Sequence, residues 1–211
     1  MFPLRERNQP WRTPPQGESA DEYLGAIGIT PRTGMLYDAS LSVNASMVPV
    51  ASGRAYSVDS PPANGLVTRE LAAELHQVLE RFAHEAGFDQ QQPVGVFFKP
   101  GIFGHHQVGR AADIYAIGGV GLDRWKSKWD DAMKRAIAAG GAEESRTIRE
   151  NEWRNNLGWR LYKALQSYGR WAQPYGYPIQ LFGPWTRTEG PWKYISERLL
   201  KAHRDHVHVA K

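Results

Sequence analysis

Hydrophobic residues recur with a helical period in residues 68–87, the sequence TRELAAELHQVLERFAHEAG. Thr68 can cap the start of a helix here, and Gly87 can end it. The apolar positions lie three or four residues apart, which places them on one helix face. These positions are Leu71, Leu75, Val78, Leu79 and Phe82. We therefore expect an amphipathic helix that packs one face against a core.

Three further segments show the same period. Residues 123–141 form an amphipathic stretch that ends at a glycine pair, and residues 194–203 form a short one before the C-terminal strand. Residues 149–172 are expected to form one long helix. Its inner face would carry Trp153, Leu157, Leu161 and Leu165.

Short apolar runs bounded by Gly and Pro indicate strands between these helices. The segment MVPVASGRAYSV is expected to form short strands joined by turns, and the sequence DHVHVAK to form a terminal strand. Helices and strands mix without a strict βαβ period, so the pattern predicts an α+β fold. The remaining strands are expected in residues 93–100, 112–120 and 177–183.

The domain organisation follows from where this periodicity begins. Residues 1–22 contain four prolines and are expected to form an extended polar arm. Residues 23–211 are expected to form a single domain, with a motif-bearing core in residues 66–211. The chain shows neither the apolar run of a signal peptide nor a transmembrane stretch of about 18 apolar residues. Any passage across a membrane would therefore need another route, such as a carrier or cell lysis.

Composition narrows the chemistry. Hydrophobic residues make up 41% of the 211 residues, enough for a packed core. The net charge of +4 favours anionic partners such as wall polymers. Lys and Arg are scattered, so no nucleic-acid-binding arm is expected. The absence of cysteine leaves His, Asp and Glu as the strong metal ligands.

Two clusters hold such ligands. The segment FGHHQVGRAADIY contains His106 and Asp113, with Gly109 between them to let the chain turn. The segment HRDHVH near the C-terminus contains His206 and His208, which face the same side of a strand. An isolated histidine is more often a surface residue than a ligand. A catalytic zinc ion takes three protein ligands and keeps one open position, and His106, Asp113 and His208 supply that set.

The two segments also resemble a known family. HQVGRAAD is similar to the His-x-x-Gly-x-Ala-x-Asp motif of D-Ala-D-Ala carboxypeptidases and dipeptidases, and HVH is similar to their terminal His-x-His. This group, the LAS metallopeptidases, includes penicillin-insensitive murein endopeptidases and phage wall endopeptidases. The resemblance implies an α+β fold with a small antiparallel sheet flanked by helices around a single zinc (Zn²⁺) site. It also implies hydrolysis of peptide bonds in peptidoglycan stem peptides.

The resemblance assigns roles to the C-terminal cluster. His106, Asp113 and His208 would be the metal ligands. The catalytic acid of the family falls at Asp205, whereas the murein endopeptidase branch has a histidine that matches His203. The general base therefore stays open between Asp205 and His203. His206 would donate a hydrogen bond to the developing oxyanion.

Substrate contacts are expected from cations near the motif. Arg110 lies inside it, Lys99 precedes it, and Arg54 lies further upstream. His105 is expected to be a loop residue beside the site. The aromatic loop that contains Trp185 and Trp192 would line a groove or, more often for such loops, anchor packing.

These features together predict a zinc metallopeptidase of the cell wall, acting in the periplasm or outside the cell, with endopeptidase slightly favoured over carboxypeptidase. Such a protein could serve as a phage lysin or a secreted antibacterial effector. The alternatives are a non-catalytic zinc-containing binding module of the same fold, or a structural part of a phage or secretion apparatus. The sequence names no delivery or immunity partner.

Overall fold

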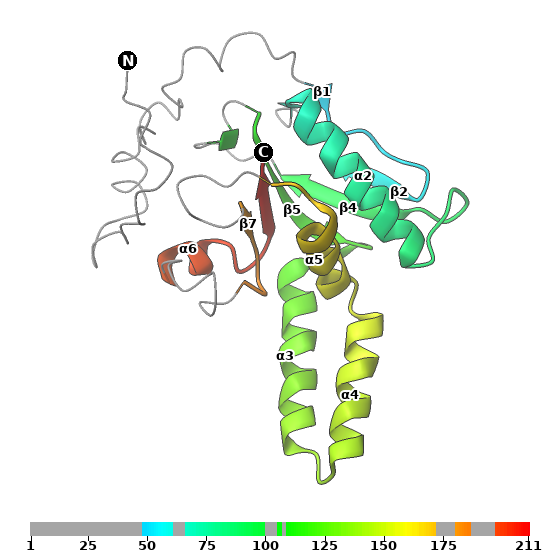
Figure 1. Ribbon diagram of the computed structural model, residues 1–211, viewed down its shortest axis with the longest axis vertical. Helices are drawn as coiled ribbons and strands as arrows, with labels where there is room; N and C mark the ends of the chain where they lie inside the picture. Colours follow the sequence, from blue (N-terminus) through cyan, green and yellow to red (C-terminus); the bar gives the residue numbers. More distant parts are fainter. Residues whose placement is uncertain (1–47, 61–65, 100–104, 107–108, 172–179, 187–196) are drawn as a thin grey trace.

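The computed structural model describes residues 48–60, 66–99, 105–106, 109–171, 180–186 and 197–211. The expected arm in residues 1–22 lies outside these ranges, as do the start of the expected domain and Trp192. The described part is a mixed α+β fold, as predicted, with five helices around the sheet strands (Figure 1). None of the described helices has the length and hydrophobicity needed to span a membrane.

The main sheet has six strands. Its order is β2 (Tyr56–Ser60), β4 (Val94–Lys99), β5 (Ala111–Ile117), β8 (Val207–Ala210) and β7 (Leu181–Phe182), and β6 (Val120–Gly121) also pairs with β5. A separate two-stranded sheet joins β1 (Val48–Pro49) to β3 (Leu66–Val67). The C-terminal strand thus lies in the interior of the sheet, next to the strand that follows the first motif.

The first predicted helix is confirmed as α2 (Arg69–Glu85). The Thr68 side chain accepts a hydrogen bond from the Leu71 backbone N–H, a cap worth about 1 kcal/mol. Gly87 follows the helix with φ of 90°, a conformation that favours glycine. All five apolar positions named above are buried.

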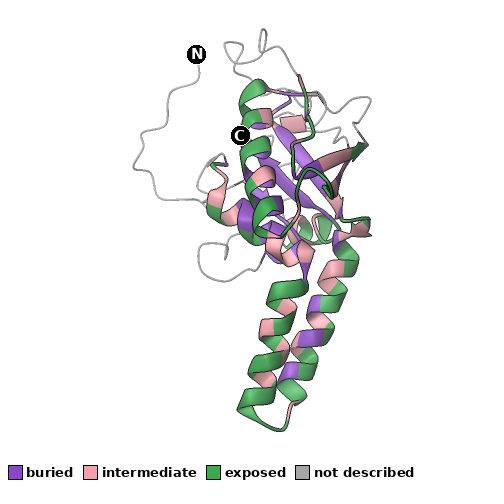
Figure 2. Ribbon diagram, turned by 90° about the vertical axis from the view of Figure 1, so that its right-hand side faces the viewer, coloured by how far each residue is buried: buried purple, intermediate pink, exposed green. Residues whose placement is uncertain are grey.

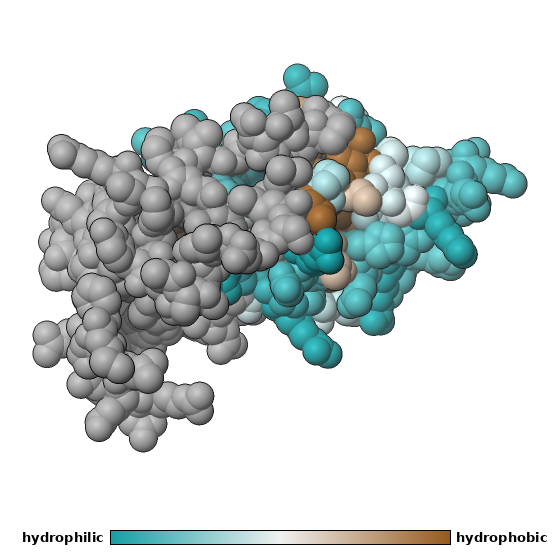
Figure 3. Space-filling view, turned by 90° about the horizontal axis from the view of Figure 1, so that it is seen from above, coloured by the Kyte–Doolittle hydropathy of each residue, from teal (hydrophilic) through white to brown (hydrophobic). Residues whose placement is uncertain are grey.

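Seen from above, most of the described surface is hydrophilic (Figure 3).

The expectation of an antiparallel sheet is wrong at one edge. β2 and β4 are parallel, with Tyr56 opposite Val94. Parallel neighbours need a long crossover connection, and α2 supplies it between these two strands. The helix at residues 68–87 was predicted, but its role as a crossover was not, because the strand before it is short and carries no strong pattern.

The expectation of one long helix in residues 149–172 is also wrong. The chain forms α4 (Ala142–Asn155) and α5 (Leu157–Tyr168), separated at Asn156. The Asn156 side chain accepts from the Trp159 backbone N–H at 2.8 Å and donates to the Trp125 carbonyl at 2.8 Å. Asparagine favours such a cap over a helix interior. Trp153, expected inside, is 47% exposed.

The helices divide into two groups. α2 and α5 pack against each other and lie beside the sheet, whereas α3 (Leu122–Ala138) and α4 form a hairpin that projects from it (Figure 1). No residue of α4 is buried. Figure 2 shows buried residues concentrated in the sheet and mostly exposed ones along the hairpin. The remaining described helix, α6 (Glu197–Ala202), leads into β8.

Candidate metal centre

Strand register aligns four residues in a row across the sheet. Lys99 on β4 is opposite Asp113 on β5, Asp113 is opposite His208 on β8, and His208 is opposite Phe182 on β7. Residues opposite each other on neighbouring strands present their side chains on the same face. The row therefore brings a carboxylate and an imidazole 95 residues apart in sequence into contact.

The opposite face of these strands is core. Ile114, Val207 and Val209 alternate with Asp113 and His208 along their strands, and all three are fully buried among hydrophobic residues. This is the alternation expected of the sequence DHVHVAK, with valines toward the core and histidines toward the site. Burial of the valines fixes the register, because a one-residue slip would exchange the two faces.

A tight turn brings His106 to the same place. His105 and His106 form a single helical turn, which Gly109 closes with φ of 68°. The backbone N–H groups of Gly109 and Arg110 donate to the carbonyls of His106 and His105, at 3.0 and 2.8 Å. In a straight strand, residues seven apart would point to opposite faces. The turn at Gly109 instead brings His106 to the same side as Asp113, as predicted from the glycine.

His106, Asp113 and His208 form a compact group of donor atoms. His106 Nε2 lies 3.3 Å from Asp113 Oδ2, and His208 Nδ1 lies 2.9 Å from Asp113 Oδ1. One ligand atom from each residue lies within 4.8 Å of the others, so the group could hold a metal ion. Two nitrogens and one carboxylate oxygen form a donor set that suits zinc.

Protonation in the cluster also suits a cation. Burial would raise the pKa of Asp113, but hydrogen bonds and charge from His106 and His208 outweigh burial and hold that pKa well below its usual range. Burial lowers the pKa of His208, against the opposing effect of Asp113. An ionised carboxylate beside a neutral imidazole is the state in which these groups bind metals.

The three residues expected to act in catalysis lie around this group. His206 Nε2 is 3.8 Å from Asp113 Oδ1, and its Nδ1 is 2.8 Å from Asp205 Oδ1. Asp205 precedes β8, and its side chain is 54% exposed. The His203 ring centroid lies 4.9 and 5.2 Å from those of His206 and His208.

His203 is held in a defined tautomer. Its Nδ1 lies 2.8 Å from the Leu199 carbonyl, which can only accept, so Nδ1 carries the proton and Nε2 keeps a free lone pair. Burial, reinforced by the charge of His208, lowers the pKa of His203 to about 3. The ring also packs against Phe182, at 5.3 Å between centroids.

Two of the three proposed substrate-binding cations lie near the centre. Lys99 is on the face of Asp113, and its ammonium lies 4.2 Å from the Tyr115 ring centroid. Arg110 Nε donates to the Lys211 carbonyl at 2.8 Å, and the Arg110 carbonyl accepts from the Lys211 N–H. Arg110 therefore helps to fasten the end of β8 beside β5.

Arg54 is not brought to the site. It precedes Tyr56, which pairs with Val94 at the start of β4, whereas the site lies level with Lys99 at the end of that strand. Its backbone N–H donates to Glu80 of α2 at 2.9 Å. The parallel pairing of β2 and β4, which was not predicted, places Arg54 at the end of the sheet opposite the site.

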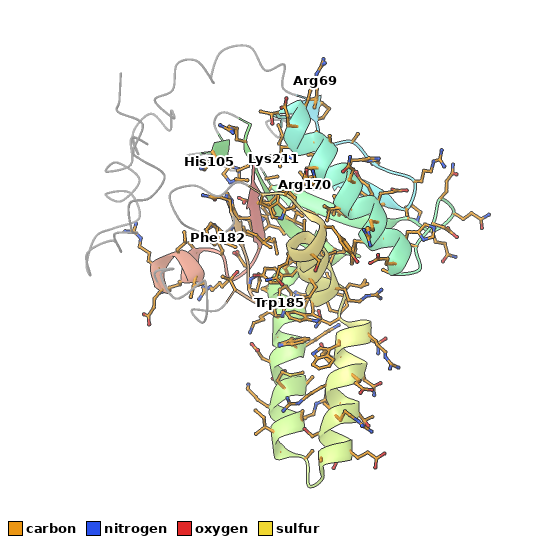
Figure 4. All side chains as sticks on the ribbon, in the orientation of Figure 1. Arg69, His105, Arg170, Phe182, Trp185 and Lys211 are labelled. Carbon is orange, nitrogen blue, oxygen red and sulfur yellow. The ribbon has the colours of Figure 1, made fainter. Side chains whose placement is uncertain are left out.

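Neither His105 nor Trp185 belongs to the group of donor atoms. His105 lies on the turn beside the site, as expected, and burial lowers its pKa to about 4. Trp185 is buried against Trp159 and Tyr162, at centroid distances of 6.2 and 5.8 Å. Figure 4 places Trp185 near the base of the helical hairpin, away from His105 and Phe182. Trp185 is therefore a packing anchor.

Sequence reasoning missed Tyr115 and Phe182. The Tyr115 ring stacks on His206, with centroids 4.6 Å apart and planes inclined by 20°. Burial, with the charges of Asp113 and Asp205, raises the pKa of Tyr115 to about 12. Its spacing of two from Asp113 was the available signal, because it places both side chains on one strand face. Phe182 offered no comparable signal.

Comparisons with known proteins add no assignment. No protein-family model matches the chain, and searches of curated proteins and of solved structures find no significant match. The two sequence motifs and the geometry of the centre are therefore the features that point to a function.

Proposed function

We propose that this protein is a zinc-dependent peptidoglycan hydrolase that cleaves peptide bonds in wall stem peptides or cross-links. The observation that carries the proposal is the buried group of His106, Asp113 and His208, with His203, Asp205 and His206 gathered beside it. Such a group is costly to bury without a function, since each charge must be compensated. A bound zinc ion would supply Lewis-acid catalysis at this point.

The surrounding residues suggest a division of roles. The His203 ring is held through Nδ1 by the Leu199 carbonyl, whereas the Asp205 carboxylate is half-exposed at the entry to β8 and accepts a hydrogen bond from His206 beside the metal group. We therefore assign to Asp205 the transfer of a proton from the attacking water to the leaving amine. His203 would instead accept a hydrogen bond at Nε2.

His206 fits the role of stabilising developing negative charge. Its Nδ1 is directed to Asp205, so its Nε2 faces the metal group. An imidazolium donates from both nitrogens, and Asp205 can accept one of these bonds while the oxyanion accepts the other. Lys99, on the same face, would contact anionic groups of the stem peptide.

The test uses the full chain incubated with purified peptidoglycan, with zinc or with a chelator, followed by mass spectrometry of the muropeptides. Cleaved cross-links would indicate an endopeptidase, the outcome we favour, and loss of terminal D-Ala a carboxypeptidase. His208→Ala should abolish product formation, and His84→Ala, on the exposed face of α2, should not. A zinc-loaded protein that changes no muropeptide would exclude the hydrolase and favour a binding module.

A second comparison tests the assignment of the base. Asp205→Asn should lower kcat by about 100-fold or more, the usual contribution of general acid–base catalysis. His203→Gln should reduce kcat much less and leave zinc content unchanged. The opposite ranking of the two variants would transfer the role to His203.

A further inference from the structure

Tyr115 occupies an irregular position in β5. Along the β4 edge, Phe97 is opposite Ala116 and Phe98 is opposite Ile114, so Tyr115 is an extra residue without a partner on β4. Ile114 and Ile117 are both fully buried although they lie three residues apart, which a regular strand would place on opposite faces. A bulge at Tyr115 explains both the missing partner on β4 and the burial of Ile114 and Ile117 on one face. Bulges commonly redirect side chains beside functional sites.

On its other edge, Tyr115 meets His206. β5 and β8 pair with Asp113 opposite His208 and Ile114 opposite Val207, so the next position along each strand places Tyr115 opposite His206. The two rings are stacked with centroids 4.6 Å apart. The Lys99 ammonium lies over the Tyr115 ring from the β4 side, at 4.2 Å. The tyrosine ring therefore lies between a strand lysine and the imidazole.

Three side chains contact the His206 ring. The half-exposed Asp205 accepts a hydrogen bond from Nδ1, and the His203 ring lies at 4.9 Å between centroids, with the planes inclined by 51°. Tyr115 stacks on the ring with its plane nearly parallel, and it is partly buried and backed by Lys99. The stack holds the imidazole in the plane in which Nδ1 reaches Asp205 and Nε2 faces the metal group.

We propose that Tyr115 is a positioning residue that holds the His206 imidazole with Nε2 toward the metal group, and that it acts through its ring rather than its hydroxyl. The kinetic part of this inference rests on the proposed function. Misplacement of a catalytic group by about 1 Å can cost about 100-fold in rate, so a side chain that fixes only an orientation can still control kcat.

Three variants separate the ring from the hydroxyl and from general effects. Tyr115→Phe keeps the stacking ring, and Tyr115→Leu removes it. Trp153→Leu makes a similar aromatic-to-leucine change on the exposed hairpin and serves as the control. Each variant is assayed for zinc content, for kcat and KM on a cross-linked muropeptide, and for the ¹⁵N chemical shifts of the His206 ring in zinc-free protein.

Tyr115→Leu should lower kcat by about 10- to 100-fold, with KM and zinc content within about twofold of the parent. Tyr115→Phe and Trp153→Leu should keep most of kcat. In the ¹⁵N spectrum, the parent and Tyr115→Phe should show one sharp pair of His206 ring signals, and Tyr115→Leu should show signals broadened by exchange between ring orientations. A parental kcat in Tyr115→Leu, or an equal loss in Tyr115→Phe, would overturn the proposal.

The ¹⁵N measurement distinguishes failure of the proposed hydrolase function from failure of the positioning role of Tyr115. Should the parent protein cleave nothing, the proposed function fails, while the His206 ring signals in the three variants still test positioning. Should Tyr115→Leu fail to fold, the Tyr115→Phe variant decides, because loss of kcat or of the single pair of His206 signals in that variant would contradict a role for the ring alone.

Discussion

Ionisable side chains are buried in the row formed by Lys99, Asp113, His208 and Phe182, apart from the exposed Lys99, whereas those on the α3–α4 hairpin are exposed or half-buried. In the row, Asp113 and His208 are 7% and 8% exposed, and each is satisfied by a specific partner from another strand. On the hairpin, ionic contacts such as Lys126 with Asp130 and Arg146 with Glu150 join neighbours four apart on one helix. Exposed pairs of this kind contribute little to stability. The buried carboxylate and imidazole of the row therefore suit a functional site, whereas the charges on the hairpin are those of a solvated helix surface.

The largest expected effect comes from removing the buried carboxylate. Asp113→Ala should weaken zinc binding by about 100-fold or more, since even groups one step removed from a metal are worth about 10- to 100-fold. The control is Asp131→Ala on the hairpin, where the carboxylate is 66% exposed. A competition titration with a zinc-binding dye measures both. Equal zinc affinities in the two variants would contradict a special role for the buried carboxylate of Asp113.

Core and hairpin should also differ in stability. Leu161→Ala, at a fully buried position of α5, should lower the free energy of unfolding by about 2–5 kcal/mol. Ile137→Ala, 77% exposed on α3, should change it by less than about 0.5 kcal/mol. Urea unfolding of the zinc-free proteins measures both values. A comparable loss at Ile137 would mean that the hairpin packs against something in solution.

Acid should destabilise the site region through His203. Its pKa of about 3 in the folded protein lies below the value of about 6.5 expected in the unfolded chain, so the unfolded state binds the proton first. This stabilising contribution is full above pH 6.5 and is lost as pH falls from there toward 3. In zinc-free protein, His203→Phe should reduce the pH slope of unfolding by about one proton below pH 6.

The matched control for this slope is His84→Phe, because His84 is exposed on α2, far along the chain from the cluster. The control should retain the slope of the parent in the same urea titrations. An unchanged slope in His203→Phe would show that this ring is solvated in the folded protein.

The smallest effect should come from shortening the hairpin. Deleting residues 131–149 and joining Asp130 to Glu150 through a short glycine linker removes the outer turns of α3 and α4. Zinc affinity should stay within about twofold of the parent, because sites that share no partners act independently. A clear loss of zinc binding, in protein that still unfolds cooperatively, would make the hairpin a support for the metal group.

The sequence alone determined the local features of this protein. The apolar period of α2, its cap at Thr68 and the alternation of valine and histidine before the C-terminus depend on neighbours within a few residues. The set of His106, Asp113 and His208 was also predicted, from the ligand chemistry open to a chain without cysteine and from the resemblance of the two motifs to a known family.

Tertiary structure decided what depends on partners far away in the chain. The helix break at Asn156 is fixed partly by the Trp125 carbonyl, the parallel pairing of β2 depends on the crossover of α2, and Arg54 is carried away from the site as a result. Tyr115 meets His206 only because β5 and β8 are neighbours in the sheet. Local propensity cannot encode these contacts, since their energies arise only when strands and helices from distant segments pack together.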